Sequence, residues 1–172
     1  MNFIHTLNDG ISIVSLVDTI VLSVLVVAAV VLWINGISRA IYRLGNGLAK
    51  RRIAVFAKND NLTSLRSLLV QSKLFRDKNI FSIPKKEDIG IAENASVYLM
   101  FWPDWKDCLD DILDKKPDSC ALIVYAPREH GPIPELTMVK LDGKRHTAVT
   151  NFRGRLLNDI VTAMITTSYE QR

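Results

Sequence analysis

The chain has 172 residues, of which 48% are hydrophobic and 23% are charged, and its mean hydropathy is +0.14. This length allows one domain of ordinary size with a short appendage. The apolar content excludes a disordered tail, and 8 glycines with 6 prolines exclude a collagen-like or low-complexity sequence. Because a positive mean hydropathy is unusual for a soluble domain, the position of the apolar residues along the chain is informative.

The apolar residues concentrate near the N-terminus. From Ile11 to Ile34 the sequence contains one charged side chain, Asp18. At 1.5 Å per residue, residues 16–34 form a helix about 28 Å long, which matches the hydrocarbon thickness of a bilayer. A cleaved signal peptide carries its positive charges before a shorter apolar run, whereas here they follow a longer one. The sequence therefore predicts one transmembrane helix over residues 16–34, within a membrane anchor of residues 1–44.

Basic side chains lie on one side of this span. No Lys or Arg precedes it, and the segment that follows holds five and no acid: Arg39, Arg43, Lys50, Arg51 and Arg52. The positive-inside rule then places the N-terminus outside and the C-terminal domain in the cytosol. We expect a juxtamembrane helix up to residue 44 and a linker over residues 45–52, with the five cations at lipid phosphates. After residue 52 the chain has 17 basic and 16 acidic residues, and this near-neutrality argues against nucleic-acid binding.

Polar side chains line one face of the predicted span. Ser12, Ser15, Thr19 and Ser23 follow helical spacing, and Asp18 lies near the same face. One interpretation places Asp18 among the outer headgroups, because a carboxylate is costly inside a membrane. The other packs several anchors together with this stripe turned inward, because polar and small residues hold helices together in lipid. The second interpretation predicts a homo-oligomer.

After residue 52, apolar runs of strand length alternate with helical patterns. Strands are expected at residues 53–57, 79–83, 96–102, 121–126 and 146–152. Helical patterns lie between them, and a terminal helix follows the last strand. Such alternation is typical of parallel strands joined by right-handed crossovers, with helices on both faces of the sheet. The predicted fold class of residues 53–172 is α/β, a flavodoxin-like three-layer domain with about five mainly parallel strands.

The segment before the last strand breaks the alternation. Pro132 and Pro134 argue against a helix, residues 137–141 alternate between polar and apolar, and Asp142-Gly143 is a strong turn signal. The sequence predicts a small antiparallel hairpin here.

Ligands of doubly wound sheets bind beyond the carboxyl ends of the strands. The residues expected there form a basic rim that carries an aromatic side chain: Lys58, Asn59, Trp102, Asp104, Arg128, Asn151, Arg153 and Arg155. Arg153 and Arg155 open the terminal helix, whose N-terminal amides favour anions, so a phosphate or nucleotide is the predicted ligand. The alternative is that these two arginines pair with Asp159 or with interface lipids.

Two stretches, ASVYLMFWPDWKDCLDDIL and TAVTNFRGRLLNDIV, together with the strand pattern, resemble TIR-like and related Rossmannoid domains over residues 52–170. Bacteria tether such domains to membrane helices in antiviral defence, where they sense a nucleotide messenger or act on nucleotides. The resemblance implies a single-pass protein of the bacterial inner membrane. In NAD-cleaving members the helix after the third strand carries a Trp-Cys pair and a catalytic Glu. Here that helix has Trp105, Cys108 and Asp111 but no Glu, which argues against NAD cleavage.

Motifs of defined enzymes are absent from the sequence, including GxGxxG, the P-loop, HExxH and GxSxG. No catalytic residue and no metal ligand are therefore predicted, and a nucleotide is the expected ligand in place of a bound cofactor. Three functions follow. The first is a sensor-effector that binds a nucleotide messenger or partner protein and assembles in the membrane. The second is a tethered NAD-processing enzyme, and the third is a non-catalytic module that recruits a partner to the membrane.

Overall fold

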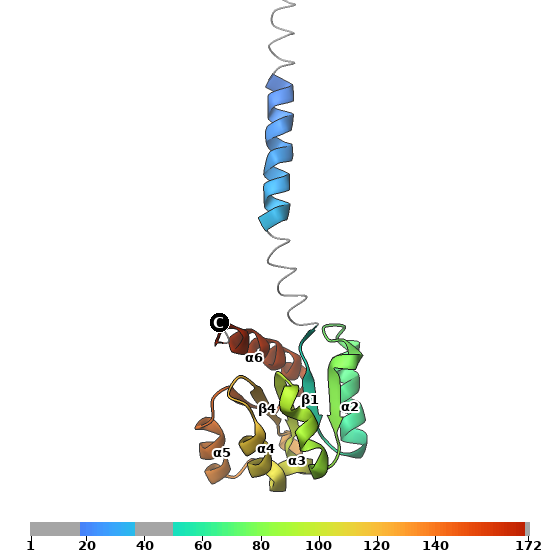
Figure 1. Ribbon diagram of the computed structural model, residues 1–172, viewed down its shortest axis with the longest axis vertical. Helices are drawn as coiled ribbons and strands as arrows, with labels where there is room; N and C mark the ends of the chain where they lie inside the picture. The colour runs from blue at the N-terminus through green and yellow to red at the C-terminus, as the bar shows by residue number, and fades with distance from the viewer. Residues whose placement is uncertain (1–17, 37–49, 171–172) are drawn as a thin grey trace, which may run out of the picture. The chain divides into compact units, whose positions relative to one another are not determined.

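The computed structural model describes residues 18–36 and 50–170, with side chains described up to residue 167. Contacts within the chain divide it into two compact units, Met1–Leu44 and Gly45–Arg172. Figure 1 shows the described helix of the first unit and the sheet of the second.

The first unit contains the helix Asp18–Gly36, which has 19 residues and a mean hydropathy of 2.4. It is long and apolar enough to cross a membrane, and none of its apolar window is buried inside the structure. Its polar stripe is partly satisfied internally, because the Ser23 hydroxyl donates to the Thr19 carbonyl oxygen at 2.8 Å. Four residues of the predicted stripe and basic block lie outside the described residues: Ser12, Ser15, Arg39 and Arg43.

The second unit is built on a sheet of five strands, β1 (Ile53–Phe56), β2 (Ile80–Ile83), β3 (Val97–Phe101), β4 (Ala121–Tyr125) and β5 (Thr147–Thr150). The strand order is β2-β1-β3-β4-β5, and every neighbouring pair is parallel. This is the flavodoxin-like order of doubly wound sheets. The predicted α/β class with five strands is confirmed. The three central strands are buried on both faces, which explains their continuous apolar runs.

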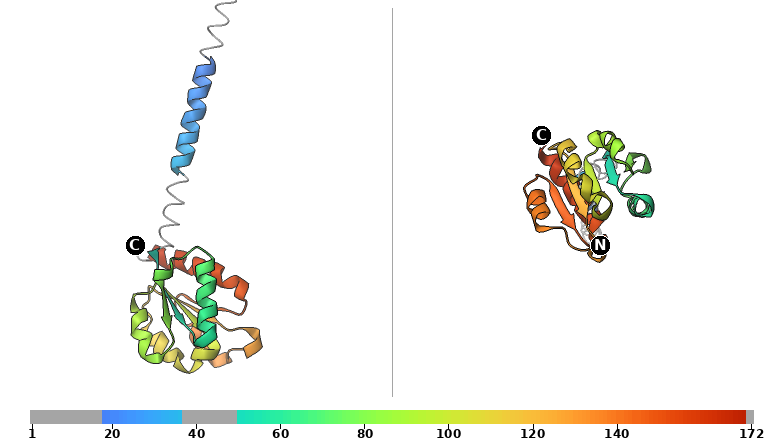
Figure 2. Two further views of the ribbon diagram at one scale, coloured as in Figure 1. Left: turned by 90° about the vertical axis from the view of Figure 1, so that its right-hand side faces the viewer. Right: turned by 90° about the horizontal axis from the view of Figure 1, so that it is seen from below.

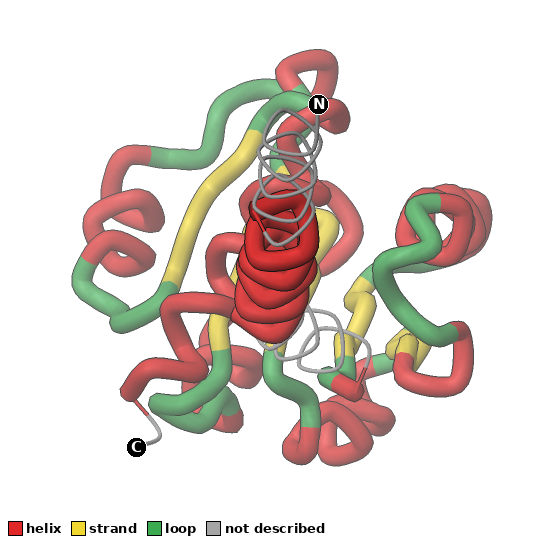
Figure 3. Tube along the Cα trace, turned by 90° about the horizontal axis from the view of Figure 1, so that it is seen from above, coloured by secondary structure: helices red, strands yellow, loops and turns green. Residues whose placement is uncertain are grey.

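The helices are α2 (Asn59–Gln71), α3 (Trp102–Trp105), α4 (Leu109–Lys115), α5 (Glu135–Asp142) and α6 (Leu156–Glu170). Side chains of α2 and α6 share one apolar cluster with one face of the sheet. Side chains of α3, α4, α5 and the 3₁₀ segment Lys86–Asn94 share a second cluster with the other face. The domain therefore has three layers. Figure 2 shows α2 in front of the strands in its left-hand view, and Figure 3 shows the strands (yellow) among the helices (red).

The predicted hairpin is wrong, because residues 135–142 form helix α5 and no antiparallel pair joins the five strands. Pro134 precedes the helix, a position where its missing N–H and fixed φ do no harm. Its carbonyl oxygen accepts hydrogen bonds from the N–H groups of Thr137 and Met138, both at 3.0 Å. Gly143 ends the helix instead of forming a hairpin turn. Alternation over so few residues did not distinguish a strand from a helix.

The helix predicted after β3 is interrupted. α3 ends at Trp105, the 3₁₀ segment Lys106–Cys108 follows, and α4 begins at Leu109. Trp105 is buried with Leu109 in the second cluster, whereas Cys108 is half-buried against it.

The chain enters the domain beside the end of α6. Arg51 Nη1 donates to the Thr167 hydroxyl at 3.2 Å, and burial lowers the pKa of Arg51. The Arg52 guanidinium lies 5.7 Å from the centre of the Phe81 ring. These two cations of the basic block therefore contact the domain itself.

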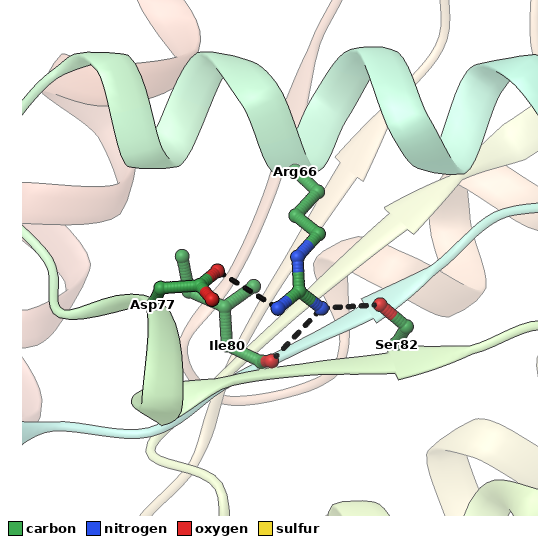
Figure 4. A network of polar contacts seen from close by, with 4 residues as sticks. All are labelled: Arg66, Asp77, Ile80 and Ser82. Carbon is green, nitrogen blue, oxygen red and sulfur yellow. Dashed lines mark hydrogen bonds and ion pairs between the residues drawn. The ribbon is translucent and has the colours of Figure 1, made fainter.

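Arg66 joins α2 to the edge strand β2. Its guanidinium donates to the Ser82 hydroxyl at 3.0 Å and the Ile80 carbonyl oxygen at 3.5 Å, and it pairs with Asp77 at 2.8 Å (Figure 4). The network fixes the register of α2 along the sheet. It thereby sets the position of the first turn of α2, which lies at the candidate site.

Candidate ligand site at the carboxyl edge of the sheet

The switch in strand order falls between β1 and β3, which lie side by side although α2 and β2 separate them in sequence. Their carboxyl ends lead into α2 and α3, at the lower edge of the sheet in Figure 1. Because all strands are parallel, this edge is opposite the one where the chain enters through Arg51 and Arg52.

Asp104 bridges the two elements at this switch point. Its Oδ2 accepts a hydrogen bond from the backbone N–H of Lys58 at 2.7 Å. The Asn61 side-chain amide lies 3.3 Å from Oδ1 and 3.2 Å from Oδ2. The carboxylate thus lies at the N-terminus of α2, where the helix dipole stabilises negative charge. Two of the predicted rim residues, Lys58 and Asp104, are in direct contact.

The side chain of Lys58, which lies in the turn from β1 into α2, approaches an aromatic ring. Its ammonium lies 6.0 Å from the centre of the Trp105 ring. Asn59, the next residue, has φ 45°, a left-handed conformation that Asn tolerates better than most residues. Neither Asn59 nor Lys58 is buried. The turn carries no glycine, so its amides have no open phosphate cradle of the P-loop type.

Arg153 connects the β5–α6 junction to α2. Its Nη1 donates to the Ser64 hydroxyl at 2.8 Å and its Nη2 to the Ser64 carbonyl oxygen at 3.1 Å. Ser64 lies one helical turn after Asn61, so Asp104 and Arg153 both contact the first two turns of α2. Sequence reasoning missed Asn61 and Ser64 as site residues.

Aromatic side chains surround the cations at the ends of β3, β4 and β5. The Phe101 ring lies 5.7 Å from that of Tyr125 and 5.8 Å from that of His130, between ring centres. Arg128 lies over the Phe152 ring at 4.5 Å, and Phe152 is 48% exposed. Burial raises the pKa of the Tyr125 hydroxyl, and the positive charge of Arg153 opposes this shift.

The structure divides the predicted rim into four groups. Lys58 and Asp104 meet at α2, while Arg128 and Arg153 lie at the ends of β4 and β5. Trp102 is buried in the second apolar cluster. The remaining three are exposed, and their side chains make no hydrogen bond or ion pair within the described part of the chain: Asn59, Asn151 and Arg155.

The structure does not show the alternative, in which Arg153 and Arg155 pair with Asp159. Among residues 50–167, whose side chains the structure describes, the ion pairs include Arg66–Asp77, Lys86–Asp111 and Lys140–Asp110. Asp159 is in none of them, and the partner of Arg153 is Ser64. Phe152 and Tyr125 were also missed, because an apolar residue at a strand end has no distinctive sequence signal for binding.

No group of three or more His, Cys, Asp or Glu side chains that could hold a metal ion occurs within the described residues. At this edge of the sheet the four cations Lys58, Arg128, Arg153 and Arg155 exceed three carboxylates, Asp60, Asp104 and Glu129, of which Asp104 is hydrogen-bonded inward. The arrangement is chemically suited to binding an anion, and an exposed aromatic ring lies next to it.

No family model, curated protein or solved structure matches this chain. The geometry of the carboxyl edge is therefore the evidence on which a function rests.

Proposed function

We propose that the protein is a membrane-anchored sensor whose α/β domain binds a phosphate-bearing ligand, such as a nucleotide, through Arg128, Arg153 and Arg155. The observation that carries this proposal is the position of these arginines. They lie at the carboxyl edge of a β2-β1-β3-β4-β5 sheet, where doubly wound folds bind ligands. In residues 18–36 and 50–170, no ion pair joins any of them to a carboxylate.

The fixed geometry of Arg153 supports the role of an anchor for phosphate. Two of its donors are held by Ser64, so its guanidinium is positioned before a ligand arrives. Pre-positioned groups bind more tightly because less side-chain freedom is lost. Phe152, exposed beside Arg128, offers a ring on which a nucleobase can stack. We therefore favour a nucleotide over inorganic phosphate.

The effector half of the proposal concerns the anchor. The helix Asp18–Gly36 crosses the bacterial inner membrane once, with its N-terminus outside and the α/β domain in the cytosol. The five basic residues after the span support this orientation. Several anchors assemble with Asp18 and Thr19 inward and perturb the membrane when ligand is bound, as in antiphage defence. The edge of the sheet that binds the ligand is opposite the edge where the chain enters the domain.

A binding experiment on the full-length protein in detergent tests the ligand. Calorimetric titration with pyrophosphate, ADP and cyclic dinucleotides should detect binding of at least one of them. Arg155→Ala should weaken that binding at least about tenfold, because a charge-assisted bond to phosphate contributes about 1.5–3 kcal/mol. Arg76→Ala is a matched control, because this exposed arginine precedes β2 at the opposite edge. Equal binding by the Arg155 and Arg76 variants would refute the arginine site.

A second experiment tests the effector. Expression of the full chain, with the ligand identified above, should depolarise cells, and Asp18→Asn should reduce the effect. Full depolarisation by the Asp18→Asn variant would show that the polar stripe is not needed to perturb the membrane.

A non-catalytic module that recruits a partner to the membrane is a second candidate function, and one observation favours it. Leu136 is 87% exposed and Val139 66% exposed on one face of α5, and no described element covers them. If pyrophosphate and all nucleotides fail to bind, this function becomes the first choice. NAD cleavage has no such support, because Asp111 pairs with Lys86 at 2.5 Å and Trp105 is buried.

A further inference from the structure

The chain after β3 changes its helical geometry twice within seven residues. The backbone departs from helical values at Trp105 (φ −127°, ψ 8°) and again at Cys108 (φ −109°, ψ 11°). A 3₁₀ segment inside a helix often marks a hinge. Residues 102–108, here named the β3 cover, therefore end at a break before the regular helix α4.

One carboxylate fastens the β3 cover to the turn between β1 and α2. Asp104 accepts the Lys58 N–H at 2.7 Å and contacts the Asn61 amide. Apolar packing also holds the cover, because Trp102 and Trp105 are buried in the second cluster and the Trp105 ring packs edge-on against Phe56 at 5.3 Å. Cys108 lies half-buried at the far end of the cover.

The groups around this fastening are hydrogen-bond donors. They are the Lys58 N–H and the Asn61 amide, and the Lys58 ammonium lies over the ring of Trp105, whose indole N–H is a further donor. Trp105 is 1% exposed, and its Nε1 has no hydrogen-bond partner in the described part of the structure. A buried donor without a partner is rare in native proteins and calls for an explanation. A ligand acceptor that reaches it when the cover moves provides one.

We propose that the β3 cover is a hinged lid, and that Asp104 is a built-in anion which a phosphate group of the ligand displaces. The closed lid satisfies the Lys58 N–H internally and leaves the Trp105 N–H unpaired. In the open lid, phosphate oxygens accept from both. The choice of phosphate rests on the proposed function, whereas the hinge itself does not. Because Asp104 repels anions while it is in place, only a group that binds these donors better than the carboxylate opens the lid.

Thiol labelling tests the hinge without any ligand. In the full-length protein in detergent, Cys108 should react several-fold faster with a thiol reagent in Asp104→Asn than in wild type. Asp107→Asn is the matched control, because it removes an exposed charge from the same segment. Asn61→Asp provides a second route, since it sets a carboxylate against Asp104 and should also accelerate labelling. Mass spectrometry identifies the labelled cysteine. Equal rates in Asp104→Asn, Asn61→Asp and Asp107→Asn overturn the hinge.

Pyrophosphate titration of the same variants tests whether a phosphate group displaces Asp104. Asp104→Asn should bind pyrophosphate about tenfold more tightly than wild type, and Asp107→Asn should match wild type. Trp105→Phe, introduced into Asp104→Asn, should reverse part of the gain. If Arg153→Ala weakens binding and Asp104→Asn leaves it unchanged, the displaced-anion role fails and the arginine site stands. If Asp104→Asn tightens binding and Arg153→Ala has no effect, the lid stands and the arginine site fails.

Discussion

Arg153 and Ser64 are joined by two hydrogen bonds across 89 positions of sequence, from the 3₁₀ segment before the last helix to the second turn of α2. The contact links the two helices that cover one face of the sheet. It gives Arg153 a structural role beside the ligand role proposed for it, and the two can be separated by experiment.

Arg153→Ala should lower both stability and phosphate binding, whereas Arg155→Ala should lower binding alone. Loss of the bonds to Ser64 should reduce the free energy of unfolding by about 1 kcal/mol, because a typical bond contributes that much. Arg155 is exposed just before α6, and its side chain makes no hydrogen bond or ion pair within the described residues. Thermal unfolding and calorimetric titration of both variants measure the difference. Ser64→Ala is the control that keeps the guanidinium, and an unchanged melting temperature in Arg153→Ala would contradict the structural role.

Arg66 should contribute more to stability through its neutral partners than through its ion pair. Asp77 is exposed, and exposed ion pairs contribute at most about 1 kcal/mol. Arg66→Met removes the bonds to Ser82 and Ile80 as well, and should destabilise by about 1–3 kcal/mol. Denaturant unfolding of Arg66→Met and Asp77→Asn compares the two. An equal loss in both variants would assign the effect to the ion pair.

The domain should lose stability in alkali because of Cys120. Burial raises the pKa of this thiol from 9.0 to about 12. The unfolded chain therefore releases the proton first, so the contribution is complete below pH 9 and is lost as the pH rises from 9 toward 12. Denaturant midpoints measured across this range should fall more steeply in wild type than in Cys120→Ala. Cys108→Ala, which alters a half-buried thiol, should follow wild type.

Apolar residues of helix α5 should differ in how much their substitution lowers the stability of the domain. Lysine at Leu136 and Val139 should leave the melting temperature within a few degrees of wild type, because both side chains are exposed. Leu141→Ala should destabilise by about 2–5 kcal/mol, because Leu141 is fully buried. Thermal unfolding decides the matter. If the two lysines also abolish capture of a specific partner, the recruitment function gains support.

A reporter fused after Arg172 should be active in the cytosol. The expectation follows from the basic residues after the span and the absence of Lys and Arg before it in this sequence. Paired fusions, one to a reporter active in the cytosol and one to a reporter active outside it, give the measurement. Activity of the outside reporter would reverse the orientation and place the ligand edge outside the cytosol.

The sequence by itself determined the apolar helix, the five strand runs and the α/β class. These are local properties, since an uninterrupted apolar run of a given length has few folded solutions and prolines mark where runs stop. Even the candidate rim followed from strand ends, because parallel strands bring their carboxyl ends to one edge. The hairpin failed because five alternating residues carry too little periodicity to exclude a short helix.

Only the tertiary structure decided which rim residues meet. The bond from Lys58 to Asp104 spans 46 positions, and it exists because β3 pairs with β1 while β2 lies on the other side. Likewise, Arg153 reaches Ser64 because α2 and α6 cover the same face of the sheet. Strand order and helix side are set by packing over the whole core, which no short segment of the sequence encodes.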